Sequence, residues 1–163
     1  MKRFELVFFR HGIADAGTPD RDRALTEDGV RKTWAAGEGL KKMAIPFDRI
    51  LTSPWTRAVQ TATILSEVMG MAAPEVLPEL AGDHTAKDLL GALAGIQGKS
   101  LLLVGHQPLL GEAVAELLGA AGNCEIDIRK SGACSVEVEG LPRKKPAVLN
   151  WLMTSRQLRA LSK

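Results

Sequence analysis

The feature that most constrains the fold is an apolar run over residues 4–9 that ends abruptly in Arg10 and His11. The run has the length of a strand and almost no polar face, which is typical of a strand covered by helices on both sides. A second apolar run, residues 101–104, leads to His106. The chain is therefore expected to fold around a buried sheet whose strands end in polar residues.

Helical and strand patterns alternate through the first two thirds of the chain. Thr26 is expected to be the N-cap of a first helix, and a strand is expected at residues 49–52. The next helix is expected to start with Ser53 as N-cap and Pro54 at its first position. This alternation favours a largely parallel sheet with helices on both faces.

The last third of the chain has a different pattern. Residues 125–128 and 133–139 alternate between apolar and polar side chains, and a further strand is expected at residues 147–153. Such alternation predicts antiparallel strands at a sheet edge. Together the patterns predict a three-layer α/β/α sandwich with a mostly parallel central sheet and antiparallel edge strands. Residues 1–163 are expected to form a single domain.

Composition narrows the classes of partner. The chain is 45% hydrophobic and 25% charged, with a net charge of only +2, so nothing in the overall charge indicates binding to nucleic acid or to a membrane. No run approaches the ~20 apolar residues of a membrane span. The two cysteines, Cys124 and Cys134, lack zinc-site spacing and are expected to be reduced. A cytoplasmic protein is expected.

The candidate catalytic and binding residues lie at three strand ends. In parallel sheets, ligands bind outside the carboxyl ends of the strands. Arg10 and His11, Arg57 and His106 all fall at such ends, although each motif alone is a weak signal. Together they form a cationic cluster, which is unfavourable unless an anion sits in it. The planar fork of arginine suits phosphate oxygens, so the pattern predicts a phosphate pocket.

Histidine at such a pocket indicates a two-step phosphoryl transfer. A neutral imidazole can attack phosphorus near neutral pH and leave again easily. The arginines would hold the phosphoryl oxygens, and the second histidine would donate a hydrogen bond or a proton to the same group. This chemistry needs no metal and no cofactor, and none is expected.

With these residues the sequence resembles the histidine phosphatase superfamily, which has the phosphoglycerate-mutase-like fold. Within that superfamily it resembles the small SixA-type phosphohistidine phosphatases. The matching stretches run in order along nearly the whole chain. They are residues 9–12, 24–26 with Gly29, 53–61, 76–80, 104–108, 130–133 and 150–153. The motif Ser-Pro-x-x-Arg-Ala-x-Gln-Thr at residues 53–61 is the most specific of them.

The resemblance implies a role for each matching residue. It makes His11 the nucleophile and places Arg10, Arg57 and His106 around the phosphoryl group. Larger relatives carry a general acid after the third strand, where this chain offers Glu79 and Asp83 as candidates. A site without a strong acid would suit phosphorylated nitrogen better than phosphate esters, because a protonated imidazole leaves readily.

Three functions are consistent with these residues. The leading hypothesis is a phosphatase that removes the phosphoryl group from phosphohistidine in a protein, through a covalent phosphohistidine intermediate on the enzyme. The alternative is a phosphatase of small-molecule phosphate esters. A non-catalytic module that binds phosphoproteins is the third, and it would not need His11. Contact of substrate with Trp55 or with the long loop from Ile13 to Leu25 is left open.

Overall fold

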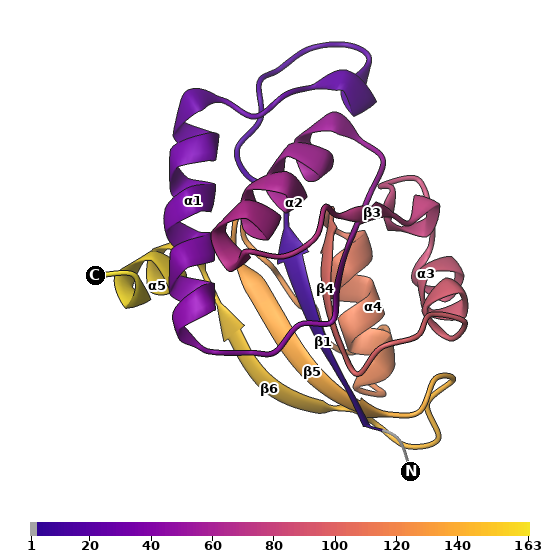
Figure 1. Cartoon of the computed structure of the whole chain (residues 1–163). Helices are drawn as coiled ribbons and strands as arrows, with labels where there is room; N and C mark the ends of the chain where they lie inside the picture. Colours follow the sequence, from indigo (N-terminus) through magenta and orange to yellow (C-terminus); the bar gives the residue numbers. More distant parts are fainter. Residues whose placement is uncertain (1–2) are drawn as a thin grey trace.

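A single six-stranded sheet forms the centre of the protein, whose computed structural model describes residues 3–163 (Figure 1). The strands lie in the order β3-β2-β4-β1-β5-β6. Their bounds are β1 Arg3–Arg10, β2 Arg49–Thr52, β3 Glu75–Val76, β4 Ser100–Gly105, β5 Ala133–Glu139 and β6 Val148–Met153. Strands β1 to β4 pair in parallel, whereas β5 pairs antiparallel with both β1 and β6. The predicted mostly parallel sheet with antiparallel pairing toward one edge is confirmed.

Helices cover both faces of this sheet, which makes the predicted three layers (Figure 1). Helices α1, α2 and α5 pack on one face, and α3 and α4 pack on the other. Their bounds are α1 Glu27–Lys42, α2 Thr56–Met69, α3 Ala86–Leu93, α4 Leu109–Leu117 and α5 Ser155–Leu161. Two short 3-10 turns, η1 Asp20–Asp22 and η2 Pro78–Leu80, lie in the connections. Within the described chain, no helix is both long and apolar enough to cross a membrane.

The apolar character of β1 follows from its place between the two helical layers. Leu6 and Phe8 pack into the core under α3 and α4, whereas Val7 and Phe9 pack into the core under α1, α2 and α5. All four side chains are fully buried. Each contributes about 1.5–3 kcal/mol of hydrophobic stabilisation. The strand that leads to His11 is therefore packed on both faces.

The start of α2 differs from its prediction. The helix begins at Thr56, not at Pro54, and its N-cap is Trp55, which makes no side-chain capping bond. Ser53 does not cap the helix because its hydroxyl is used elsewhere: Oγ accepts the backbone N–H of Trp55 at 3.1 Å and lies 2.8 Å from Nε2 of His106. Thr26 does cap α1 as predicted, accepting the N–H of Gly29.

The strand predicted at residues 125–128 is absent from the sheet. Ile126 and Ile128 are buried in the core, which explains the alternation of apolar and polar residues. The carbonyls of these two residues accept hydrogen bonds from side chains, Gln107 Nε2 and Arg10 Nη1, in place of a neighbouring strand. The prediction is wrong because the alternation shows which side chains are buried. It does not show whether the backbone pairs with a neighbouring strand or with side chains.

The contact between α1 and α5 depends on one glycine. A Cβ atom on Gly39 would lie 1.8 Å from the carbonyl oxygen of Leu158, so the two backbones meet without a side chain between them. We expect Gly39→Ala to lower the free energy of unfolding by about 1–3 kcal/mol, because the helices must move apart. Urea denaturation followed by circular dichroism measures this.

Gly91 in α3 gives the matched control, since a Cβ there would meet nothing within 4 Å. Gly91→Ala should raise the free energy of unfolding by about 0.5–1 kcal/mol through helix propensity alone. Equal effects of the two substitutions would contradict the close approach of the helices.

Candidate active site

The register of the sheet brings three strand ends together. Parallel pairing aligns Arg10 with Gly105, and the backbone N–H of His11 donates to the carbonyl of Gly105 at 3.0 Å. The N–H of Ser53, after β2, donates to the carbonyl of Val104 at 2.9 Å. The residues that follow β1, β2 and β4 therefore meet at one edge, as the strand pattern predicts.

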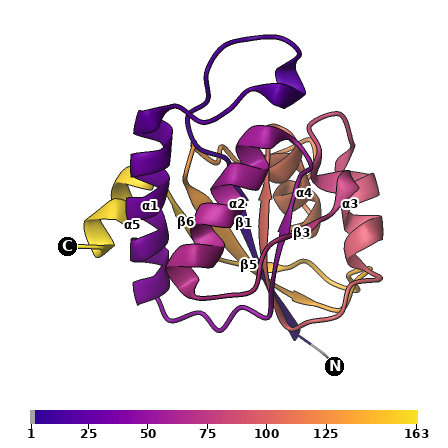
Figure 2. The ribbon, with the colours of Figure 1, turned by 45° about the horizontal axis from the view of Figure 1, so that its top comes forward.

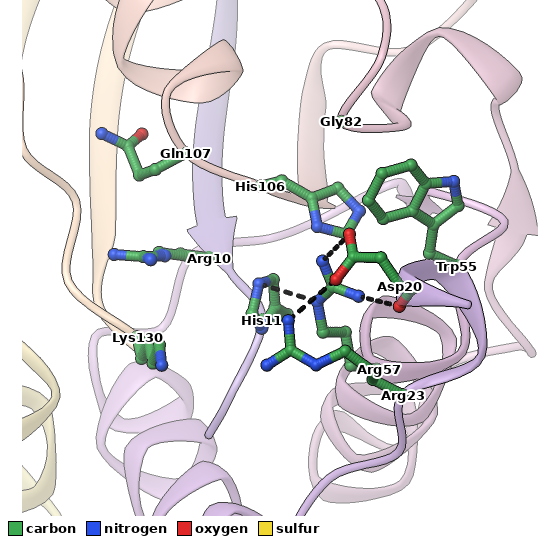
Figure 3. A pocket seen from close by; sticks show the side chains of 10 residues that line it. All are labelled: Arg10, His11, Asp20, Arg23, Trp55, Arg57, Gly82, His106, Gln107 and Lys130. Carbon is green, nitrogen blue, oxygen red and sulfur yellow. Dashed lines mark hydrogen bonds and ion pairs between the residues drawn. The ribbon is translucent and has the colours of Figure 1, made fainter. Parts of the chain in front are cut away.

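A cavity of about 280 Å³ opens at this edge (Figure 3). All four residues proposed from the sequence line it. Six further residues complete the lining, and together the ten are Arg10, His11, Asp20, Arg23, Trp55, Arg57, Gly82, His106, Gln107 and Lys130. The two candidate acids, Glu79 and Asp83, lie outside this set. Asp83 is exposed and pairs with its neighbour His84.

His11 presents an unprotonated nitrogen to the cavity. Its Nδ1 lies 2.7 Å from the carbonyl oxygen of Gly12, which can only accept, so Nδ1 carries the ring proton. The Nε of Arg57 donates to Nε2 of His11 at 3.2 Å. Burial lowers the pKa of His11 to about 4, and the charges of Arg57 and Arg10 add to this effect. At neutral pH the ring is neutral, with its lone pair on Nε2.

His106 lies beside His11, with 5.0 Å between the ring centroids. Burial, followed by the neighbouring His11 and Arg57, lowers the pKa of His106 to about 3. Nε2 is 2.8 Å from the Ser53 hydroxyl, whereas Nδ1 is buried and has no hydrogen-bond partner. A Ser53 hydroxyl that donates to Nε2 leaves the ring proton on Nδ1. His106 would then offer an unused donor to a bound anion.

The two arginines differ in how fully their donors are used. Arg57 is only 5% exposed, and its guanidinium contacts both His11 and Asp20. Arg10 donates from Nη1 to the carbonyl of Ile128 at 3.2 Å, and its buried Nε has no partner. Burial also lowers the pKa of Arg10 from its usual value. A phosphoryl group would offer acceptors to the donors that the protein leaves open.

Asp20 is a pocket residue that the sequence reasoning missed. It lies in η1, within the long loop that stands out beside α2 (Figure 2). Its carboxylate pairs with Arg57 at 3.2 Å and with Arg23 at 2.8 Å, and its carbonyl accepts from Arg57 Nη1 at 2.7 Å. Among the residues described, it is the only carboxylate that lines the cavity. The loop's unusual length was the available signal, but length does not identify the residue.

Trp55 and Lys130 form opposite sides of the cavity (Figure 3). The centroids of the Trp55 and His106 rings lie 4.6 Å apart. The guanidinium carbon of Arg57 lies 5.0 Å from the centroid of the Trp55 ring. Trp55 therefore lines the pocket, which the sequence left open. Lys130 adds a further positive charge near His11. In the described part of the chain, no three His, Cys, Asp or Glu side chains are grouped to hold a metal ion.

The lowered pKa values of the histidines predict their behaviour with pH. Neither ring should titrate between about pH 7 and about pH 5, because both stay neutral in the folded state. Unfolded histidines gain protons below their ordinary pKa of 6.5, so these two residues reduce folding stability as the pH falls from 6.5 toward 4. NMR titration of the imidazole signals tests this. A ring titrating near its ordinary pKa would contradict it, and added orthophosphate should raise both pKa values.

The Asp20–Arg57 contact predicts competition with anions. The hydrogen bond from Arg23, and then the charge of Arg57, lower the pKa of Asp20, so its carboxylate is ionised at neutral pH. We expect Asp20→Asn to tighten orthophosphate binding by about two- to fivefold, because Arg57 loses a competing anion. Isothermal calorimetry measures the change. A loss of binding would show instead that Asp20 supports the pocket.

Comparison with known proteins identifies the family of this chain. The family described as histidine phosphatase superfamily (branch 1) matches residues 6–82. An uncharacterised protein of Picosynechococcus sp. is 38% identical over 78% of this chain and 81% of its own length. The phosphohistidine phosphatase SixA of Escherichia coli is 35% identical over 69% of this chain and 73% of its own length.

A solved structure extends the likeness to the whole fold. The protein histidine phosphatase SixA complexed with tungstate superposes with a TM-score of 0.83, at 28% identity, over 95% of this chain and 99% of that one. This superposition agrees with the fold described above. The chain belongs to the histidine phosphatase superfamily and is of the SixA type.

Proposed function

We propose that this protein is a phosphohistidine phosphatase that transfers the phosphoryl group of a phosphorylated protein to His11 and then to water. The observation that carries the proposal is the state of His11: a buried, neutral ring with its lone pair on Nε2, facing a cavity lined by Arg10, Arg57 and His106. The E. coli relative named SixA phosphohistidine phosphatase supports the choice of substrate.

In the first step, Arg57 Nε gives up its hydrogen bond to His11 Nε2, the freed lone pair attacks phosphorus, and the bond between phosphorus and the substrate nitrogen breaks. The arginines hold the phosphoryl oxygens, where negative charge is spread in the transition state. Nδ1 of His11 keeps its proton throughout, because the carbonyl of Gly12 holds it. The enzyme intermediate is therefore a phosphorylated imidazolium whose positive charge is stabilised by that carbonyl.

The leaving group explains why an acid is dispensable. A phosphohistidine side chain with a proton on its second ring nitrogen leaves as neutral imidazole and needs no further proton. Asp20 is ionised and paired with Arg57 and Arg23, so it is a poor proton donor. An alkoxide leaving group would need such a donor. The site thus favours phosphorylated nitrogen over phosphate esters.

In the second step, water attacks phosphorus and His11 leaves as the neutral ring, regenerated with its proton still on Nδ1. The water releases one proton to the phosphate or to solvent, and inorganic phosphate departs. His106 can donate from Nδ1 to a phosphoryl oxygen in both steps, with Ser53 holding Nε2.

We also propose a cytoplasmic site of action, which suits the free thiols of Cys124 and Cys134.

Substitution of the nucleophile tests the covalent route. His11→Ala should lower the turnover of a phosphorylated histidine-transfer protein by about 10⁴-fold or more, because the attacking atom is lost. Rapid alkaline denaturation followed by mass spectrometry should detect phosphate on His11 in the wild type and none in the variant. His84→Ala is the matched control, since His84 lies outside the cavity.

Substrate class is tested with the same wild-type protein. Turnover of the phosphorylated histidine-transfer protein is compared with a panel of phosphate esters under one set of conditions. Comparable or better turnover of an ester would reject phosphohistidine as the preferred substrate. Intact activity in His11→Ala would reject the covalent route, and binding without turnover of any compound would indicate a binding module.

A further inference from the structure

A second basic cavity adjoins the catalytic pocket and has no part in the mechanism above. It has a volume of about 350 Å³ and shares Arg10 and Lys130 with the catalytic pocket. Figure 3 shows these two residues on the side of the catalytic pocket away from Trp55. The second cavity therefore begins where the predicted phosphate site ends.

The charged residues that line this second cavity are all positive. Five basic side chains line it, and no acidic residue does so among residues 3–163; the five are Arg10, Lys32, Arg129, Lys130 and Arg159. They come from β1, α1, the segment before β5, and α5. Cations gathered from separate segments repel one another, so an anion between them relieves an unfavourable interaction.

The protein's own carboxylates neutralise only part of this charge. Asp28 pairs with Lys32, and Asp127 pairs with Arg129, each at 3.0 Å. The Nε of Arg159 donates only to the neutral hydroxyl of Ser155, at 3.3 Å. Lys130 is in none of the ion pairs found in the described chain. Three of the five cations, Arg10, Lys130 and Arg159, thus line the cavity without an ion-pair partner among the described residues.

Backbone hydrogen bonds shape the turn at residues 129–132, which carries two of these cations. Ser131 is buried and has a positive φ of 54°, which is uncommon for a residue with a side chain. Its N–H donates to the carbonyl of Arg10 at 3.0 Å, and its hydroxyl lies 2.8 Å from that of Thr33. The N–H of Gly132 donates to the carbonyl of Arg129, so residues 129–132 form a tight turn. Lys130 is thereby held on the rim between the two cavities.

We propose that this second basic cavity binds a carboxylate side chain of the same phosphoprotein whose phosphohistidine occupies the catalytic pocket. The inference rests on the proposed function, because the two anions must belong to one substrate. A second phosphoryl group on a small molecule would use the same chemistry, and the experiment below separates the two sources. The cavity would then select among phosphohistidine sequences by the position of an acidic neighbour.

The test uses phosphohistidine peptides in which one glutamate is placed in turn at each position near the phosphohistidine, with glutamine at the same positions as reference. For one or two positions, the wild type should prefer glutamate by about two- to fivefold in kcat/KM, through KM, and high salt should remove the preference. Arg159→Gln should abolish the preference and leave the turnover of phosphoramidate unchanged. Arg156→Gln, on the same helix but outside the cavity, should keep it.

Binding of the same peptides to His11→Ala, measured by calorimetry, separates the two proposals. A glutamate preference in binding, without turnover by the wild type, would leave the cavity assigned and reject the phosphatase function. Turnover with no glutamate preference, and equal effects of Arg159→Gln and Arg156→Gln, would overturn the cavity assignment alone. An effect of Arg159→Gln confined to doubly phosphorylated small esters would overturn the protein carboxylate in favour of a second phosphoryl group.

Discussion

The parallel pairing of β1 with β4 is the constraint on which the site depends. Its register places Gly105 opposite Arg10, so that His11 and His106 leave the sheet side by side. Two hydrogen bonds link α2 to the end of β1 and so position Arg57. The N–H of Gly12 donates to the hydroxyl of Thr61, and this hydroxyl donates to the carbonyl of Arg57. Strand and helix therefore set the distance between nucleophile and guanidinium before any ligand arrives.

Burial resolves the electrostatic problem that this arrangement creates. Two histidines and two arginines in one pocket would repel one another if all were charged. Because both histidines are almost fully buried, their pKa values fall well below neutrality and the rings stay uncharged. The same desolvation that removes the repulsion keeps the attacking nitrogen unprotonated. Stability of the pocket and reactivity of His11 thus have one physical cause.

Sequence reasoning succeeded where the chain is regular. The apolar runs and helix signals identified the layers and the parallel sheet, and parallel strand ends then brought His11, Arg57 and His106 to one edge. It failed for Asp20 because a loop carries no periodicity that reports where a side chain points. Ser53 was misread as a cap, since a local pattern cannot reveal that its hydroxyl faces a residue fifty-three positions away. The second basic cavity was missed because separate segments supply it.

The contact between Asp20 and Arg57 has a consequence for the catalytic cycle. The most buried guanidinium of the pocket, that of Arg57, already pairs with a carboxylate carried on a loop that stands outside the sheet. A phosphoryl group bound to Arg57 would replace this carboxylate, and departure of phosphate would restore the ion pair. A carboxylate that competes for Arg57 would weaken the binding of substrate and of phosphate alike, and so would favour release of the product.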